Sequence, residues 1–187
     1  MKIDLLDEQT AYAGFYRLRR LKLAHERYDG GMTPPLVREV VERSDVGAAL
    51  LVDDARGRVV LVEQFRPGPY AAGQSPWLVD IVAGRIVSGH TPEETIIREI
   101  LEEAGVDCHD LHPIGCHYTA PHITSERVHL FCAQVDSTRI AGTHGVADEG
   151  EDIRPVTLER IEALRLLESH TLSLWAGLAL RWLAARF

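Results

Sequence analysis

The segment from Thr91 to Gly105 is the strongest folding signal in this 187-residue chain. Thr91 suits an N-cap with Glu94 three residues later, Pro92 takes the first helical position, and Gly105 suits a left-handed C-cap. With about 100° of rotation per residue, the predicted helix has two adjoining faces. The apolar face, expected to pack on the core, contains Ile96, Ile97, Ile100, Leu101 and Ala104. The acidic face contains Glu99, Glu102 and Glu103.

The acidic face has a cost that needs an explanation. Carboxylates three or four residues apart repel each other by roughly 0.2–0.5 kcal/mol per pair, and acids near the C-terminal end also oppose the helix dipole. A solvated acidic face is the ordinary explanation for such residues. Because these acids border the apolar stripe, we favour the alternative that they bind a hard cation, which prefers oxygen ligands.

The same helix resembles the Nudix box, G-x5-E-x7-R-E-U-x-E-E-x-G-U, in which U is aliphatic. The matching residues are Gly84 and the run Arg98-Glu99-Ile100-Leu101-Glu102-Glu103-Ala104-Gly105-Val106. One position departs from the pattern, because His90 stands where the family has its first Glu. The chain is similar over almost its whole length to bacterial ADP-ribose pyrophosphatases of this family, through segments 12–16, 37–39, 60–66, 82–84, 124–127 and 144–153.

This resemblance implies a magnesium centre. The implied ligands are the carboxylates of Glu99, Glu103 and Glu151 and the backbone carbonyl of Ala83. They would hold roughly two or three Mg²⁺ ions, with Mn²⁺ as the alternative metal.

The resemblance also implies a catalytic set of Glu149, Arg98 and Glu102. Glu149 matches the general base of the family, Arg98 would orient carboxylates, and Glu102 would act as a weaker ligand through water. Without the resemblance, Arg98 is interpreted as a surface ion-pair partner of Glu102, and the acids of segment 147–152 as an exposed turn.

Five further residues match substrate contacts of the family. Arg66 resembles the phosphate-binding arginine, for which a bidentate guanidinium is well suited, and Arg85 is a second phosphate candidate. Phe15, Arg38 and Glu126 match positions that contact the nucleoside or the terminal ribose, with Phe15 stacking on the base. The alternatives are a core aromatic for Phe15 and a surface arginine for Arg38.

The expected fold is α/β, with two regions. Residues 1–43 predict a small antiparallel sheet, to which the resemblance assigns dimerisation and substrate contacts. For residues 44–187 the resemblance implies the Nudix α/β/α sandwich with a mixed sheet. Strands are expected at 46–52, 58–65, 77–82, 115–119 and 126–135, and a mostly helical tail from Leu158 to Phe187. By resemblance, the first sheet is swapped in a homodimer, so that Phe15 and Arg38 act across it.

Composition excludes several other classes of protein. The net charge of -8 disfavours nucleic-acid binding, which requires a basic surface. The absence of a signal peptide and of an apolar run of about 20 residues predicts a cytoplasmic protein that does not enter a membrane. Three cysteines without C-x-x-C spacing argue against a disulfide framework.

The predicted activity is hydrolysis of the pyrophosphate bond of a nucleoside diphosphate derivative, with ADP-ribose split to AMP and ribose 5-phosphate. Two departures bear on this activity: Asp80 replaces a Glu that is frequent in the family, and His122-Ile123 replace two glycines next to Glu126. Bulky side chains there would crowd the pocket. A GDP-mannose-like pyrophosphatase is therefore one alternative. His90 in the box supports a second, a catalytically idle nucleotide sensor.

Overall fold

The computed structural model describes residues 1–169 and 172–186. The chain forms two compact units. The first comprises Met1–Asp45 and Tyr118–Arg127, and the second comprises Val46–His117 and Val128–Phe187. The role of residues 1–43 in dimerisation and substrate contact remains a prediction.

The first unit contains a three-stranded sheet formed by β1 (Ile3–Ala13), β2 (Arg17–His25) and β3 (Leu36–Glu42). Both strand pairs are antiparallel, which confirms the predicted small antiparallel sheet. β1 was not predicted, because nearly all of its residues are exposed and its sequence lacks strict apolar alternation. The segment before Glu126 bonds along β3, where the Val41 N–H donates to the Ile123 carbonyl over 2.8 Å.

The second unit contains a seven-stranded sheet in the order β10-β5-β4-β9-β8, with β6 paired to β5 and β7 paired to β4. The strands are β4 (Val46–Asp53), β5 (Arg58–Phe65), β6 (Trp77–Asp80), β7 (Val82–Arg85), β8 (Cys108–Tyr118), β9 (Arg127–Val135) and β10 (Arg154–Glu159). β4 runs parallel to β9 and antiparallel to β5 and β7, so the sheet is mixed as predicted. The expected strand 77–82 is two short strands, because β6 and β7 pair with different neighbours.

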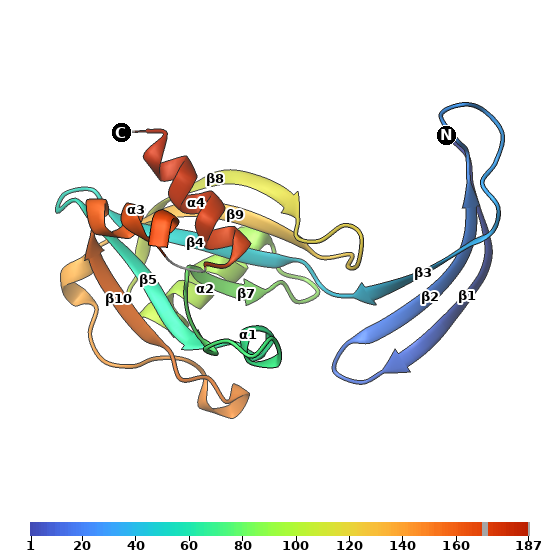
Figure 1. Cartoon of the computed structure of the whole chain (residues 1–187). Helices are drawn as coiled ribbons and strands as arrows, with labels where there is room; N and C mark the ends of the chain where they lie inside the picture. Colours follow the sequence, from blue (N-terminus) through green and yellow to red (C-terminus); the bar gives the residue numbers. More distant parts are fainter. Residues whose placement is uncertain (170–171, 187) are drawn as a thin grey trace. The chain divides into compact units, whose positions relative to one another are not determined.

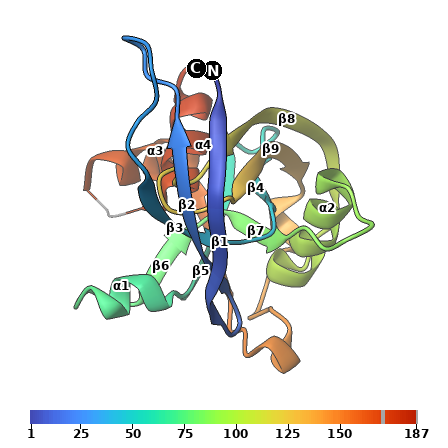
Figure 2. The same cartoon turned by 90° about the vertical axis from the view of Figure 1, so that its right-hand side faces the viewer.

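Helices cover both faces of this sheet (Figures 1 and 2). α2 (Pro92–Ala104) packs on one face, and α3 (Arg160–Ser169) and α4 (Leu174–Ala184) pack on the other. All eight residues of β4 are buried between these layers, where each large aliphatic side chain contributes roughly 1.5–3 kcal/mol. The α/β/α sandwich is confirmed. The short helices are α1 (Pro67–Ala71), η1 (Ser137–Arg139) and η2 (Ala147–Glu149).

The tail differs from its predicted form at its start. Residues 154–159 form β10, which pairs with β5, and the helices begin at Arg160. Residues 170, 171 and 187 of the predicted helical tail lie outside the described residues. Among the helices that the structure describes, none has both the length and the apolar character required to cross a bilayer.

Candidate active site

The helix α2 begins and ends as its sequence predicts. Thr91 Oγ1 accepts from the Glu94 N–H over 3.1 Å, and the Glu94 carboxylate accepts from the Thr91 N–H over 2.9 Å. Gly105 has a φ of 65° and closes the helix by donating to the Leu101 carbonyl. These local bonds satisfy backbone groups that a helix end otherwise leaves unpaired.

The buried face of α2 differs from the expected apolar face. Ile97 is 51% exposed and Leu101 is 54% exposed, so the prediction that they pack in the core is wrong. The helix is turned so that two acids lie among its buried residues, which are Thr95, Ile96, Glu99, Ile100, Glu103 and Ala104. Burying carboxylates while exposing aliphatic side chains has a high cost in free energy. Buried acids beside exposed aliphatic side chains are typical of a functional site.

Gly84 provides the space in which Glu99 lies. This glycine belongs to β7, directly beside α2, and a Cβ atom at Gly84 would lie 1.9 Å from the Glu99 carboxyl carbon. Any side chain there would displace the carboxylate. The glycine at the start of the box and the first acid of its helix are therefore coupled by packing.

Glu103 lies one helical turn further on and is 1% exposed. Its carboxylate accepts a hydrogen bond from the backbone N–H of Ala83 over 3.2 Å. The pKa of Glu103 is raised to about 8, chiefly by burial, and the Glu99 and Glu151 charges add to the increase while the Ala83 N–H and Arg66 oppose it. The predicted ligand role of the Ala83 carbonyl remains a prediction.

Arg98 joins the exposed side of this acidic cluster. Its guanidinium is 2.5 Å from the Glu99 carboxylate and also pairs with Glu102. Burial raises the pKa of Glu99, and the nearby Glu102 and Glu151 charges add to the increase while Arg98 opposes it. Arg98 thus makes the ion pair with Glu102 that either interpretation requires, and it also contacts a buried acid.

The loop that carries Glu149 and Glu151 is fastened to the end of α2. The Gly145 N–H donates to the Glu102 carbonyl over 2.9 Å, and His144 occupies the space over Gly105. Within the loop, the Glu151 carboxylate accepts from the Val146 N–H over 3.0 Å. This attachment brings the charge of Glu151 close enough to raise the pKa of Glu99.

Glu149 lies in η2 and is exposed. Gly150 follows it with a φ of 71°, which ends the short helix. The negative charge of Glu149 acts on Arg98, so this side chain also lies on the acidic side of α2. An exposed carboxylate at the rim of the cluster suits a proton acceptor better than a permanent ligand.

The donor set of this cluster fits a hard divalent cation. Glu99 and Glu103 supply carboxylate oxygens in a desolvated place, and the charge of Glu99 adds to the raised pKa of Glu103. A divalent cation would relieve this repulsion. In the part of the chain that the structure describes, no three Asp, Glu, His or Cys side chains converge closely enough to enclose an ion as they stand. Glu99 is occupied by Arg98, and Glu103 by Ala83.

Arg66 approaches the cluster from the end of β5. It occupies the N-cap position of the short helix α1 without a side-chain capping bond, and its backbone N–H donates to the Pro76 carbonyl over 2.7 Å. Its guanidinium lies 3.8 Å from the Asp80 carboxylate, and its charge lowers the pKa of Glu103. The structure therefore places a cation beside the buried acids, as a phosphate-binding role requires.

Comparison with known proteins identifies the family of this chain. The family model described as NUDIX domain matches residues 43–176 of the chain. The chain belongs to the Nudix family. The similarity predicted from the Nudix box is thereby confirmed, with His90 as the departing position.

Several relatives of this Nudix protein are similar over most of their length. The chain is 35% identical over 182 residues to the ADP-ribose pyrophosphatase of Escherichia coli (strain K12), covering 97% of this chain and 87% of that protein. It is 34% identical over 189 residues to the Haemophilus influenzae ADP-ribose pyrophosphatase, with coverage of 99% and 87%. A GDP-mannose pyrophosphatase of Pectobacterium atrosepticum is 30% identical over 166 residues, with coverage of 88% and 84%.

A solved structure shows the same fold. The crystal structure of an ADP compounds hydrolase superposes with a TM-score of 0.71 at 22% sequence identity. The superposition covers 100% of this chain and 96% of that one.

Three predicted substrate residues of the Nudix protein lie in the first unit. Phe15, in the turn between β1 and β2, is 80% exposed, so the alternative of a core aromatic is wrong. Its ring meets Tyr16 edge to face, with the centroids 4.8 Å apart. Arg38 lies in β3, where its guanidinium donates to the Val37 carbonyl over 2.8 Å. Exposed aromatic rings can stack on planar groups such as nucleobases.

Glu126 is more enclosed than a direct substrate contact would suggest. Its side chain is 3% exposed, accepts from Thr119 Oγ1 over 3.0 Å, and lies 2.9 Å from the Arg43 guanidinium. Its contact with the terminal ribose remains a prediction. Arg85, at the end of β7, is exposed, and its phosphate contact also remains a prediction.

Two residues that the sequence did not single out have visible roles in these networks. Arg43 pairs with Glu126, and its guanidinium lies 4.8 Å from the centre of the Tyr16 ring. Ser173 donates a hydrogen bond to the buried Asp80. Neither belongs to a motif, and only the tertiary contacts identify them.

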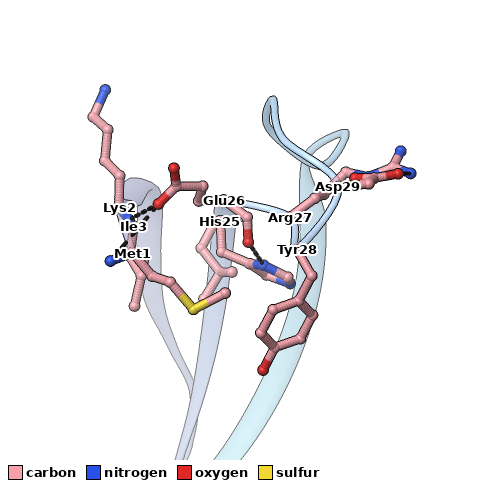
Figure 3. Close-up of a pocket in the computed structure, with 9 residues that line it drawn as sticks. Met1, Lys2, Ile3, His25, Glu26, Arg27, Tyr28 and Asp29 are labelled. Carbon is pink, nitrogen blue, oxygen red and sulfur yellow. Dashed lines mark hydrogen bonds and ion pairs between the residues drawn. The ribbon is translucent and has the colours of Figure 1, made fainter.

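A hollow in the first unit lies at the end of the hairpin away from Phe15 (Figure 3). Its lining is mainly apolar, and its charged groups bond to their neighbours. Glu26 accepts from the Lys2 N–H over 3.0 Å, and Arg27 pairs with Asp29.

Proposed function

We propose that this Nudix protein hydrolyses the pyrophosphate bond of ADP-ribose to give AMP and ribose 5-phosphate. The observation that carries the proposal is the pair of buried carboxylates, Glu99 and Glu103, one turn apart on α2 and beside the β7 backbone. The ADP-ribose pyrophosphatases at 34–35% identity support the choice of substrate.

The acidic cluster would hold roughly two or three Mg²⁺ ions, with Mn²⁺ as the alternative, and these would lower the pKa of a bound water and neutralise charge on the diphosphate. Glu99, Glu103 and Glu151, with the Ala83 carbonyl, are the proposed ligands. Arg98 and Glu102 orient this set through the ion pairs described above.

Glu149 is the proposed general base, and its carboxylate takes the proton of the attacking water. Its exposed place on η2, next to glycine, allows the side chain to approach a bound substrate. Arg66 and Arg85 bind the phosphates. Phe15 stacks on the base, and Arg38 and Glu126 bind the nucleoside or the terminal ribose.

GDP-mannose is the second candidate substrate, because the chain is also similar to a GDP-mannose pyrophosphatase. The loop before Glu126 gives a structural reason to test GDP-mannose. Its Ile123 is 48% exposed, where a bulky side chain can restrict the sugar that fits.

A substrate panel tests the proposal. Purified protein is incubated with ADP-ribose or GDP-mannose and Mg²⁺, and the products are treated with phosphatase and assayed for phosphate. We expect ADP-ribose to be cleaved fastest, and chelation by EDTA to abolish cleavage. Binding of ADP-ribose without cleavage of any substrate would instead favour the idle nucleotide sensor.

We also propose that the protein is a cytoplasmic homodimer in which the first sheet is exchanged, and that it binds neither nucleic acid nor membranes. The support is the thin sheet, too small for a core of its own, and its exposed apolar side chains, which are Ile3, Leu5, Leu6 and Tyr12. The net charge of -8 disfavours polyanion binding. Light scattering should give twice the mass of one chain, and a monomer at micromolar concentration would contradict the dimer.

A further inference from the structure

Asp80 is a buried acid that the proposed chemistry does not use. It ends β6 and is 2% exposed. Its Oδ1 atom accepts two hydrogen bonds, from Ser173 Oγ over 2.5 Å and from the Ile81 N–H over 2.8 Å. Its Oδ2 atom faces Arg66, with 3.8 Å between the oxygen and Nη2. The two oxygens thus serve different partners.

The burial of Asp80 requires compensation. An ionised carboxylate in the interior is stable only when it is paired and hydrogen-bonded. Burial raises the pKa of Asp80, and Ser173, Arg66 and the Ile81 N–H oppose that increase. Because Oδ1 is occupied by Ser173 and Ile81, Arg66 is the cationic partner of Oδ2.

Ser173 fixes the orientation of Asp80. It is the N-cap of α4, where its Oγ accepts from the Ala176 N–H over 3.1 Å. A hydroxyl has a single hydrogen to donate, and here that hydrogen goes to Asp80. α4 is held in turn by its buried residues, which are Ala176, Ala179, Leu180 and Leu183. The start of the C-terminal helix is therefore connected to Arg66 through one carboxylate.

We propose that Asp80 is a positioning residue for Arg66, and that Ser173 at the start of α4 holds Asp80 in the orientation this requires. The proposal rests on the proposed function, because Arg66 is taken as the residue that binds the diphosphate. Asp80 directs the guanidinium towards the acids of α2, whose Glu103 already experiences the charge of Arg66. The C-terminal helix then sets the affinity for the diphosphate without contacting it.

The variant Asp80→Asn distinguishes positioning from simple electrostatics. Removing a negative charge near an anion site would by itself strengthen binding of the diphosphate. If Asp80 positions Arg66, binding weakens instead. We expect KM for ADP-ribose to rise about tenfold, which corresponds to about 1.4 kcal/mol, with kcat changed less than about threefold. The Kd of a non-hydrolysable α,β-methylene analogue, measured by calorimetry, should rise by the same factor.

A double-mutant cycle with Arg66→Ala provides the coupling between the two residues. We expect Arg66→Ala to raise KM at least as much as Asp80→Asn, and the double variant to resemble Arg66→Ala alone. Additive effects, or an unchanged or lower KM in Asp80→Asn, would overturn the proposal. Failure of the wild-type protein to bind or cleave ADP-ribose would instead overturn the proposed function.

Two variants at position 173 test the positioning role even if Asp80→Asn fails to fold. Ser173→Thr retains the hydroxyl and should have the wild-type KM. Ser173→Gly retains an acceptable N-cap, but it loses the donor to Asp80, so KM should rise about threefold or more. Equal KM values for the two variants, with only the melting temperature changed, would show a structural role and contradict the positioning role.

Discussion

At the scale of single residues, Glu103 is an acidic side chain that is buried almost completely. The carboxyl group is 1% exposed, and its pKa is raised to about 8. A side chain in this condition destabilises the folded protein whenever it is ionised without a cation. A buried acid at this position is explained if a cation binds its ionised form during catalysis.

We expect Glu103→Gln to lower kcat about a hundredfold or more, because the amide is a poor ligand for a hard cation. The amide oxygen can still accept from the Ala83 N–H, and burial of an amide costs less than burial of a charge. The melting temperature without metal should therefore be equal or higher. Activity and thermal melts of both proteins check this, with exposed Glu93→Gln on the same helix as control. Wild-type kcat in Glu103→Gln would contradict the metal site.

Asp53 is a second buried acid, and its role is structural. It ends β4, and its carboxylate accepts from the Ser137 hydroxyl over 2.6 Å, from the Ser137 N–H over 3.0 Å and from Arg56 over 3.1 Å. Burial alone would raise the pKa of Asp53, but these bonds outweigh it and lower the pKa to about 2.

We expect Asp53→Asn to lower the free energy of unfolding by about 2 kcal/mol at neutral pH. Since the folded pKa of about 2 lies below the ordinary value of 3.8, the unfolded chain binds the proton first as the pH falls. The stabilisation is complete above about pH 4 and is lost as the pH falls towards 2. Urea unfolding from pH 7 to pH 2.5 should show the two proteins converging. The exposed acid variant Asp7→Asn should remain close to wild type, and a pH-independent difference would contradict the assigned pKa.

At the scale of elements, the site depends on how β7, α2 and the 144–151 loop fit together. Gly84 admits the Glu99 carboxylate against the strand, and Gly105 leaves space for His144 at the other end of the helix. Both glycines serve close approach between elements. The helix supplies the acids, but its neighbours determine where those acids point.

Gly84→Ala tests this fit. A Cβ atom would overlap Glu99 at 1.9 Å, so the carboxylate must move by an ångström or more. A misplacement of that size can cost about a hundredfold in kcat, and we expect this loss with the fold retained by circular dichroism.

Gly177→Ala in α4 is the matched control. Its Cβ atom meets no heavy atom within 4 Å, so the variant should gain about 0.5–1 kcal/mol of stability from helix propensity and keep its kcat. Equal kcat in Gly84→Ala and Gly177→Ala would show that the space above Gly84 is not needed.

At the scale of the whole molecule, the proposed chemistry draws on two compact units. The acids and Arg66 belong to the second unit, and Phe15, Arg38 and Glu126 belong to the first. Because the proposed metal ligands and general base all belong to the second unit, we expect variants of the first unit to change substrate binding and leave the chemical step intact.

Phe15→Ala should therefore raise KM for ADP-ribose about tenfold, because stacking of a base on an aromatic ring contributes roughly 1–3 kcal/mol. The value of kcat should change less than about twofold. Tyr28→Ala is the matched control, since this aromatic of the same unit is 99% exposed and outside the predicted substrate contacts. Equal KM values for the two variants would contradict the stacking role of Phe15.

The amino-acid sequence by itself determined the bounds of α2, its acidic residues and the family. These features depend on short-range signals, namely a capping box, a terminal glycine and fixed spacing along one helix, all confirmed in the structure. Only the tertiary structure decided which face of α2 is buried, so that Glu103 is enclosed while Ile97 and Leu101 are exposed. It alone joined Ser173 to Asp80, which are 93 positions apart. Contacts at such separation arise from the packing of whole elements, and no local periodicity encodes them.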